Sequence, residues 1–480
     1  MSRINTNVSS LVAARVFNRN NENLSESLER LSTGLRINRG KDDPAGLIAS
    51  QRLRSEATAI AAAIDNSRRA DNLIAVAEGG LQEVASLLVE LENLVDHTAN
   101  TAGLSTEEVQ ANQLQVDAIL ETINRIANST EFSGKKLLNG SLDYTTSGVT
   151  TGATASAITD LKINGARIAA GGYRSVVVEI TSSAQTAQLI YAGSATGAGV
   201  TTIQVAGKYG TEQFSFASGT AAADVATAIN QSKSLTGVSA TVSGTGSNTR
   251  IKINSTDYGS EAFVSVEALA GTFTVTGGSS PTKDYGEDVG ATINGAQAIA
   301  KGLDISIRGS ALNADLTLAA AFATDTSLSK TFYVTGGGAD FNISPTLGLG
   351  SLASIGLQSV STGNLGKSTS GLLSSLGSGQ TNDLSSGNFE VAQRVIRDAS
   401  AQVAALRGRL GAFQKNTLAS TINSLQVTYE NVTAAESAIR DTDFAAETAR
   451  LTRAQILVNA SSVALQQTNA APQNVLALLG

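Results

Sequence analysis

The chain has 480 residues, 41% of them hydrophobic, so its length suggests about two to four domains with apolar cores of their own. Aromatic residues make up 4% and tryptophan is absent, so the cores must consist mainly of Leu, Ile, Val and Ala. With no cysteine and a single histidine, His97, the sequence excludes disulfides, thiolate chemistry and histidine–cysteine metal centres. The net charge of −7, without any run of like charge, argues against nucleic acid and anionic membranes as partners.

Residues 1–40 are predicted to form a helical arm. Apolar residues recur there at intervals of three and four, as they do along one face of a helix. Gly34 and Gly40 break the pattern. The arm lacks the continuous apolar core of a secretory signal, because Arg15 and Arg19 come too early. No apolar stretch approaches the roughly 18 residues of a membrane span. Composition alone therefore predicts a cytoplasmic protein without a transmembrane helix.

One long helix is predicted from Asp43 to Asn100. Asp43 is a helix-capping residue, and Pro44 takes the first helical position, where proline is favoured. Such a helix would run roughly 85 Å and needs partners along its length. Glu78-Gly-Gly80 within it predicts either a hinge or a point of close packing. The second half carries an unbroken coiled-coil spacing of apolar residues: Ala77, Leu81, Val84, Leu88, Leu91 and Val95.

A shorter helix should follow and fold back antiparallel on the long one. Ser105-Thr-Glu-Glu108 is a capping-box pattern at its start. Its apolar stripe comprises Val116, Ile119, Ile123 and Ile126. Residues 132–140 then predict a hairpin that leaves the helical region.

From about Thr145 to Ser386 the chain is predicted to be mostly β, as one or two domains. Gly, Ser, Thr and Ala dominate, and apolar residues alternate with polar ones. Ile163-Asn-Gly-Ala166 recurs as Ile293-Asn-Gly-Ala296, which hints at a duplicated unit, and residues 359–386 form a low-complexity exit. The candidate strands are 202–205, 213–216, 238–242, 250–253, 263–266 and 304–308, with a single short helix at 222–230.

Helical spacing returns near the C-terminus and ends in a last arm after Asp441. Two apolar seams are separated there by a one-residue shift: Ile396, Ala399, Val403, Leu406, Leu410 and Phe413, then Leu418, Ile422, Leu425, Tyr429 and Val432. The expected fold is a mostly α rod of long coiled-coil-like helices built from both chain ends, with an inserted mostly-β (α+β) variable region. Amphipathic faces left over at both ends favour self-assembly.

The two ends of the chain closely resemble bacterial flagellin over roughly residues 1–140 and 389–480. The middle region does not match by residues. The N-terminal motifs are Asn5-Thr-Asn-Val-Ser-Ser-Leu11, Arg30-Leu-Ser-Thr-Gly-Leu-Arg-Ile-Asn38 and Asp42-Asp-Pro-Ala-Gly-Leu47. The C-terminal motifs are Asp441-Thr-Asp-Phe444, Thr452-Arg-Ala-Gln-Ile-Leu457 and Pro472-Gln-Asn-Val-Leu-Ala-Leu-Leu479.

The resemblance implies a structural subunit that polymerises into the helical flagellar filament for swimming motility, with no catalysis and no cofactor. Residues 1–42 and 440–480 would be terminal arms forming the inner tube. Residues 43–144 and 388–439 would form the outer tube, and residues 145–387 would project from the surface. Export through the flagellar type III apparatus would replace a cleaved signal, so the expected location is extracellular. The arms of flagellins are typically disordered in the monomer and fold on joining the filament.

The resemblance also implies partners: further copies in the filament, an export chaperone binding the C-terminal arm, and the hook-associated junction and cap proteins. No nucleic acid or membrane is expected, and no metal site. We expect the assembly interface to consist of apolar residues on the two arms: Val8, Leu11, Leu28, Leu31, Leu35, Ile456, Leu457, Val475, Leu476, Leu478 and Leu479.

A further implication concerns vertebrate recognition. In flagellins sensed by the flagellin-recognising Toll-like receptor, this part of the long helix presents an arginine flanked by apolar residues. Aligned on Glu78-Gly-Gly-Leu81, that arginine position is Glu90 here, a second arginine becomes Glu92, and only the leucine, Leu94, is kept. A glutamate on the neighbouring helix becomes Gln115. A charge reversal at a contact centre is costly, so weak or no recognition is expected.

Three other functions compete with this interpretation. A hook–filament junction protein shares the helical ends, but the C-terminal Pro-Gln-Asn-Val-Leu-Ala-Leu-Leu ending favours flagellin. A zinc peptidase in the insertion would lack its usual ligands, because His97 lies outside residues 145–387 and cysteine is absent. An adhesin role for the variable region remains open as an additional function.

Overall fold

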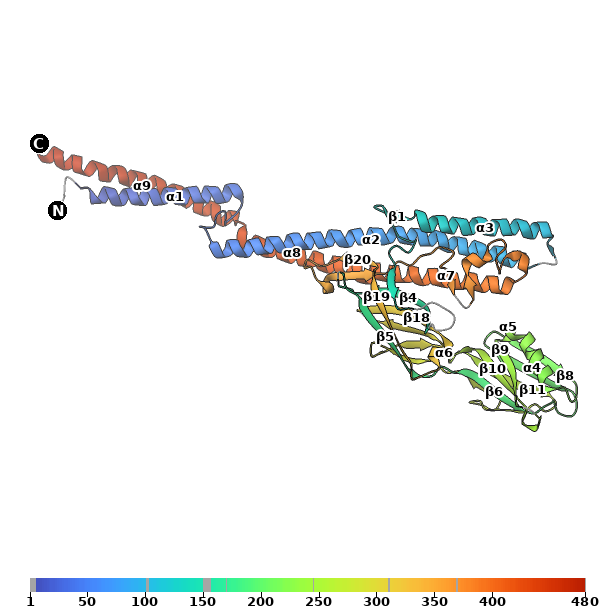
Figure 1. Ribbon diagram of the computed structural model, residues 1–480. Coiled ribbons are helices and arrows are strands. Elements are labelled where there is room, and N and C mark those ends of the chain that lie inside the picture. The colour runs from blue at the N-terminus through green and yellow to red at the C-terminus, as the bar shows by residue number, and fades with distance from the viewer. Residues whose placement is uncertain are drawn as a thin grey trace. The chain divides into compact units, whose positions relative to one another are not determined.

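The computed structural model describes residues 6–100, 103–149, 157–169, 171–244, 246–309, 311–367 and 370–479. Its contacts divide the chain into two units, each built from separate segments of the sequence. The first comprises residues 1–69, 342–347 and 416–480, and the second comprises residues 70–341 and 348–415. Figure 1 shows the chain and labels many of its elements.

In the first unit the two terminal arms are helices, α1 (Val8–Thr33) and α9 (Phe444–Leu479), lying side by side (Figure 1). They run antiparallel, because the Asn7 side chain donates to the carbonyl of Thr468 (2.7 Å) while that of Asn20 donates to the carbonyl of Leu457 (3.3 Å). Gly34 ends α1 in the left-handed conformation, as predicted. In this structure the two arms are folded helices that pair with each other. The resemblance implied that they are disordered in the monomer.

Short segments join each arm to a longer helix and pair with one another. The backbone N–H of Arg36 donates to the carbonyl of Arg440 (2.7 Å), and that of Thr442 donates to Gly34 (2.9 Å). The Asp42 carboxylate accepts hydrogen bonds from two backbone N–H groups of its own turn. Asp43 accepts from the N–H of Gly46, so it caps α2 (Pro44–Thr98), as predicted.

The first part of α2 packs against α8 (Ser420–Arg440) within the first unit. Their shared core consists of Ile60, Ala63, Ile64, Leu425 and Val432. Small residues are buried in this contact too, including Ser67, whose hydroxyl donates to the carbonyl of Ala63 (2.8 Å). Tyr429 is 41% exposed, so its predicted place in the seam is wrong.

The rest of α2 belongs to the second unit, where its predicted seam from Ala77 to Val95 is almost completely buried. The helix α3 (Thr106–Ser129) begins with the predicted capping box of Ser105 and Glu108. It runs antiparallel to α2, since Asn112 bonds to Thr98 (2.9 Å) near one end and Thr130 lies against Gly80 near the other. The predicted fold-back is confirmed.

On another side of α2 lies α7 (Phe389–Ala412), joined to it by polar pairs. Arg397 contacts Glu92 at 3.0 Å and Arg407 contacts Glu78 at 2.8 Å. Between α7 and α8 the chain forms a π-helix, Phe413–Ala419. A π-helical turn holds one residue more than an α-helical turn, which accounts for the one-residue shift between the two C-terminal seams.

The structure decides whether Glu78-Gly-Gly80 is a hinge or a point of close packing. The helix α2 continues without interruption through these residues. A side-chain carbon on Gly79 would meet open space, whereas one on Gly80 would lie 2.8 Å from Leu138 and Thr130. Gly80 is therefore a point of close packing.

The segment predicted as a low-complexity exit, residues 359–386, is instead packed onto α3 and α7 in its described part. Gln113 of α3 donates to the carbonyl of Leu376 (2.9 Å) and accepts from the N–H of Leu384 (2.8 Å). The segment contributes buried leucines at positions 365, 373, 376 and 384. It holds the hairpin β22 (Gly366–Lys367) and β23 (Gly371–Leu372) and the 3-10 turns Leu373–Leu376 and Leu384–Ser386. Composition failed here because few leucines, widely spaced, suffice to anchor a serine-rich chain.

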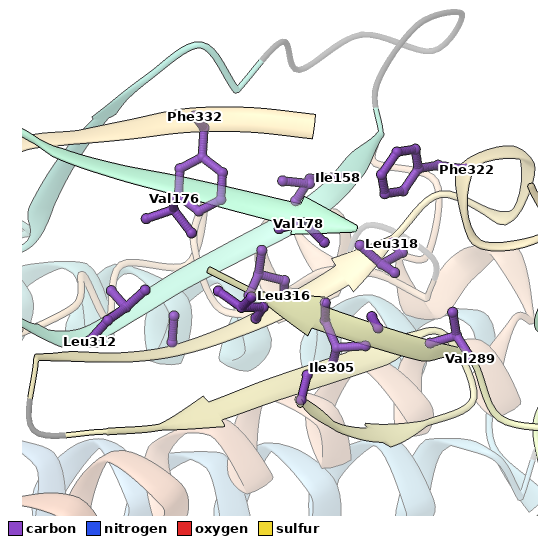
Figure 2. Close-up of a cluster of buried hydrophobic side chains, with 14 of the residues drawn as sticks. Ile158, Val176, Val178, Val289, Ile305, Leu312, Leu316, Leu318, Phe322 and Phe332 are labelled. Atoms are coloured by element: carbon purple, nitrogen blue, oxygen red, sulfur yellow. The ribbon is translucent and has the colours of Figure 1, made fainter. Parts of the chain in front are cut away.

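The insertion contains an inner β domain of two antiparallel sheets with a shared core. One sheet has the order β15-β14-β5-β19-β3 and the other β16-β17-β18-β4. Figure 2 shows Phe332, Val176 and Val178 from the first sheet facing Leu316 and Ile305 from the second. The strands are β3 (Tyr144–Ser147), β4 (Ile158–Ala166), β5 (Arg174–Ser182), β14 (Gly290–Ile293), β15 (Ala296–Gln297), β16 (Ile299–Lys301), β17 (Asp304–Arg308), β18 (Leu312–Leu318) and β19 (Ser329–Gly337).

Residues 186–285 form an outer β domain with a separate core. Its sheets have the orders β12-β6-β10-β9 and β13-β11-β7-β8, and α4 contributes to the core. The predicted helix at 222–230 and all the predicted strands but one lie in this domain. The remaining predicted strand, 304–308, is β17 of the inner β domain. The elements are β6 (Thr186–Ala192), β7 (Thr201–Gly207), β8 (Thr211–Phe216), α4 (Ala222–Gln231), α5 (Lys233–Thr236), β9 (Val238–Ser243), the 3-10 turn Gly246–Asn248, β10 (Arg250–Tyr258), β11 (Phe263–Ala270), β12 (Val275–Thr276) and β13 (Lys283–Tyr285).

Small elements complete the fold. The hairpin predicted at 132–140 is present as β1 (Glu131–Phe132) and β2 (Lys135–Lys136), turning through Ser133 and Gly134 at positive φ. The strands β20 (Ala339–Asn342) and β21 (Leu352–Ile355) form a two-stranded sheet, with a 3-10 turn at Leu349–Ser351. The prediction of a single helix in the insertion was wrong, because α5 and α6 (Ala320–Ala323) also occur. Four-residue helices are too short to show a periodicity.

The Ile-Asn-Gly-Ala repeat does not mark a duplicated structure. Asn164 lies within β4 at a shift in its pairing with β18, and its amide bonds to Asp315 (2.6 Å). Asn294 instead occupies the tight turn between β14 and β15, with a φ of 51°. The same four residues therefore adopt different backbone conformations in different sheets.

The statement that no apolar stretch approaches the length of a membrane span was wrong, because α2 is long and apolar enough, by length and composition alone, to cross a membrane. Its apolar residues have another use in the structure. Leu81, Leu88 and Leu91 are fully buried against the protein's own helices.

Candidate assembly interface

The arm α1 carries large apolar side chains that the chain itself leaves exposed. Val8 is 62% exposed and Leu11 is 64% exposed. Leu28, further along the helix, is exposed as well, whereas Leu31 and Leu35 are half-buried. Val8 and Leu11, three residues apart, share one helix face, whereas Leu28 lies on a different face. Exposed aliphatic side chains of this kind are poorly solvated by water.

The facing arm, α9, adds exposed apolar residues of its own. Ile456 is 62% exposed, and Leu457 and Val463 are exposed too. Val463 was missed by the sequence analysis, although it lies seven residues after Ile456 and so on the same helix face. The other predicted interface residues, Val475, Leu476, Leu478 and Leu479, lie where the backbone of α9 is described but the side chains are outside the described residues.

A groove of about 390 Å³ lies between the two arms. It is lined by Val8, Ser9, Val12, Ala13 and Val16 from α1 and by Ser461 and Ala464 from α9. Val12 and Val16 were not singled out from the sequence, yet each follows Val8 at four-residue intervals. Small residues on α9 and valines on α1 leave this groove open and mostly apolar.

Nearer the base of the arms a buried charge joins α1 to α9. The Glu447 side chain is only 3% exposed and contacts Arg450 at 3.2 Å and Arg30 at 4.0 Å. Its Oε1 has no hydrogen-bond partner among the described residues. A buried carboxylate needs nearby cations. Arg450 lies on the same helix as Glu447, so only the Arg30 contact links the two arms.

The four receptor-equivalent positions differ in their surroundings. Glu90 on α2 and Gln115 on α3 are exposed, and Leu94 is half-buried. Glu92 is engaged by Arg397 of α7 at 3.0 Å. His97 is exposed at the end of α2, and no group of three or more metal-binding side chains occurs within the described ranges.

Comparison with known proteins agrees with this geometry. The family model for the bacterial flagellin N-terminal helical region matches residues 4–143. The family model for the bacterial flagellin C-terminal helical region matches residues 394–479. The chain is 30% identical over 528 residues to the B-type flagellin of Pseudomonas aeruginosa, with 99% of each chain covered. The chain belongs to the bacterial flagellin family. It is also 29% identical over 478 residues to polar flagellin B/D of Vibrio parahaemolyticus, again with 99% of each covered.

Family membership settles the general role of the chain. Flagellins are structural proteins that form the extracellular flagellar filament, so this chain is a filament subunit, and swimming motility is implied by the family. A non-enzymatic role is consistent with this. The filament, not a small-molecule pocket, is therefore the setting in which the exposed arm residues must be understood.

The comparisons also correct one statement about the insertion. A third family model, for the flagellin hook IN motif, matches residues 202–257. Part of the outer β domain therefore does match a flagellin sequence pattern, although the middle region was expected not to match. Solved structures give weaker likenesses. The D2–D3 domains of the flagellar cap protein FliD from Escherichia coli share 16% identity at a TM-score of 0.28, covering 40% of this chain and 99% of that one. FliC from Burkholderia pseudomallei shares 16% identity at a TM-score of 0.24, covering 72% and 98%.

Proposed function

We propose that the paired arms, residues 1–42 and 440–480, form the inner tube of the filament. The observation that carries this proposal is the contrast between helices of similar apolar spacing. The seam of α2 is buried within the chain, whereas Val8, Leu11 and Ile456 are left exposed. Packing of other copies against these residues would remove their apolar surface from water, at roughly 25 cal/mol per Å².

We further propose that residues 43–144 and 388–439 pack as a coiled-coil-like rod forming the outer tube, with residues 145–387 projecting from the filament surface. The buried α2 seam and the polar pairs between Glu92 and Arg397 and between Glu78 and Arg407 support this packing. In coiled coils an apolar seam flanked by charged pairs sets the alignment of the helices.

A charge placed at the exposed position Leu11 on α1 tests the inner-tube role. Leu11→Asp should leave the monomer folded, because Leu11 packs little within the chain, yet abolish filament formation. Burying an unpaired carboxylate between copies would cost several kcal/mol. Val200→Asp, at a site of similar exposure in the outer β domain, is the matched control and should still polymerise. Sedimentation and electron microscopy after salt-induced assembly measure both; normal filaments from Leu11→Asp would refute the role.

The partners implied by the family are part of the same proposal. We infer that an export chaperone covers the apolar side of the C-terminal arm before secretion through the flagellar type III apparatus. Hook-associated junction and cap proteins would meet the two ends of the assembled filament. The exposed residues Ile456, Leu457 and Val463 on α9 support a covered state before export.

We also propose that this flagellin is a poor activator of the vertebrate flagellin-recognising Toll-like receptor. Glu90 presents a carboxylate at the exposed position where recognised flagellins carry arginine, and Glu92 is held by Arg397. In a reporter-cell assay the unmodified chain should activate far less than an enteric flagellin, and Glu90→Arg should increase activation. Glu83→Arg, an exposed charge change elsewhere on α2, should have no effect. Activation by the unmodified chain equal to that of the enteric protein would contradict the proposal.

A further inference from the structure

The outer and inner β domains are joined by two linkers that pair with each other. Gln185, on the outgoing linker, and Glu287, on the returning one, exchange backbone hydrogen bonds of 3.0 and 2.9 Å. The backbone N–H of Gly259, at the end of β10, also donates to the carbonyl of Gln185 (3.2 Å). The connection is thus a short paired structure and not two free strands of chain.

Beside the linkers, a turn from each domain makes direct backbone contact. Gly259 lies in the β10–β11 turn of the outer domain and Gly302 in the β16–β17 turn of the inner domain. A side-chain carbon on Gly259 would overlap the Cα of Gly302, and one on Gly302 would lie 2.9 Å from the carbonyl oxygen of Tyr258. The Tyr258 side chain packs against the core of the inner domain. The two turns therefore fit together only because neither glycine carries a side chain.

A single carboxylate on the returning linker binds both turns. Asp288 Oδ1 accepts hydrogen bonds from the backbone N–H of Gly302 (2.6 Å) and from that of Ser260 (3.0 Å). Its Oδ2 accepts from the Ser260 hydroxyl (2.6 Å). One donor comes from the inner domain and two come from the outer domain, so this carboxylate links the domains directly.

The surroundings of Asp288 favour its ionised form. Partial burial opposes its ionisation, but the hydrogen bonds from Ser260 and Gly302 and the nearby Lys301 outweigh this and lower the pKa of Asp288. Lys301 of the inner domain also pairs with Glu261 of the outer domain at 2.7 Å. That pair is exposed, so it adds little by itself. Hydrogen bonds to a charged acceptor are stronger than those between neutral groups.

We propose that Asp288 is an interdomain positioning residue that fixes the outer β domain on the inner β domain. Three charge-assisted hydrogen bonds hold the β10–β11 turn against the β16–β17 turn. The close contact between Gly259 and Gly302 restricts the two turns to one relative position. The outer domain is then carried as a rigid extension of the inner domain. This property goes beyond the filament-subunit role and does not depend on assembly.

The test measures the distance between the two domains in the full-length monomer. Because the chain has no cysteine, Thr241→Cys in the outer domain and Thr331→Cys in the inner domain accept spin labels at two exposed sites without background labelling. Pulsed dipolar spectroscopy should give one narrow distance distribution for this labelled parent. Adding Asp288→Ala should broaden the distribution, because the contact between the turns loses the hydrogen bonds that hold it.

Asp284→Ala is the matched control. The Asp284 carboxylate accepts from the N–H groups of Gln188 (2.8 Å) and Ser279 (2.9 Å), both within the outer domain, so its loss should leave the distribution narrow. A distribution for Asp288→Ala as narrow as that of the parent would overturn the proposal. If Asp288→Ala fails to fold by circular dichroism, Ser260→Ala decides: it removes only the hydroxyl donor and must broaden the distribution, while an unchanged width refutes the positioning role.

Discussion

Two adjacent glycines in α2 show how the surroundings of a residue decide its role. Glycine weakens a helix because it loses more backbone freedom on folding than any other residue. Gly79 has no atom within 4 Å of the place where a side chain would begin. A side-chain carbon placed on Gly80 would lie 2.8 Å from Leu138 and Thr130, which is closer than a methyl group tolerates. The first glycine is therefore dispensable for packing, while the second lets the hairpin region approach the helix.

These two glycines should respond oppositely to the same substitution. Gly79→Ala should raise the free energy of unfolding by about 0.5–1 kcal/mol, the usual gain from helix propensity. Gly80→Ala should give no gain or a loss, because the new methyl group displaces Leu138 and Thr130. Urea unfolding followed by circular dichroism compares the two variants. Equal stabilisation by both substitutions would show that Gly80 is not a packing contact.

At the scale of elements, helices and strands of this chain differ in how far local pattern determines them. The capping box of α3, the proline start of α2 and the seam shift at the π-helix Phe413–Ala419 are all visible in neighbouring residues. The segment before α7 is different. It is held to α3 by Gln113, whose side chain is 4% exposed and bonds to the backbone at both Leu376 and Leu384. No local signal announces a contact across more than 260 residues.

Removing the Gln113 side chain should release this segment. Gln113→Ala leaves a buried carbonyl at Leu376 and a buried N–H at Leu384 without partners, at a cost of about 1–3 kcal/mol each. Unfolding in urea should show the loss, and limited proteolysis should cut between residues 376 and 388 more rapidly. Gln115→Ala, at an exposed position of the same helix, is the control and should change neither measurement. Unchanged proteolysis of Gln113→Ala would argue against this anchoring.

At the scale of the whole molecule, the chain buries apolar side chains in several cores of its own and leaves several of those on the arms exposed. The two β domains each enclose their own core, and the seam of α2 is buried. The arms are the exception, because Val8, Leu11 and Ile456 stay exposed on folded helices. Surface of this kind is costly in a monomer and useful in a polymer.

Deleting residues 471–480 should separate folding from polymerisation. The deletion removes the apolar Val475–Leu479 stretch at the end of α9, so the expected product is a soluble monomer that forms no filaments. Gln473→Ala combined with Asn474→Ala, which keeps every apolar residue of that stretch, should still polymerise. Analytical ultracentrifugation and electron microscopy distinguish the outcomes, and regular filaments from the deletion variant would contradict the prediction.

The sequence by itself determined the helical ends of this protein, their caps, the shift between the C-terminal seams and the resemblance to flagellin. The helices, their caps and the seam shift depend on residues within one or two helical turns of each other, so local spacing is sufficient to predict them. The resemblance depends instead on the motifs at the two chain ends. In the insertion, spacing located several strands but not their partners, because pairs such as β5 with β19 and β4 with β18 join residues about 150 positions apart.

Only the tertiary structure decided which apolar faces are covered. Leu11 and Leu81 both lie in three–four seams, yet Leu11 is largely exposed and Leu81 is fully buried. Likewise, Asp284 and Asp288 look alike in the sequence, but only Asp288 accepts hydrogen bonds from both β domains. Periodicity fixes the direction in which a side chain points from its helix or strand. What meets that side chain depends on distant parts of the chain.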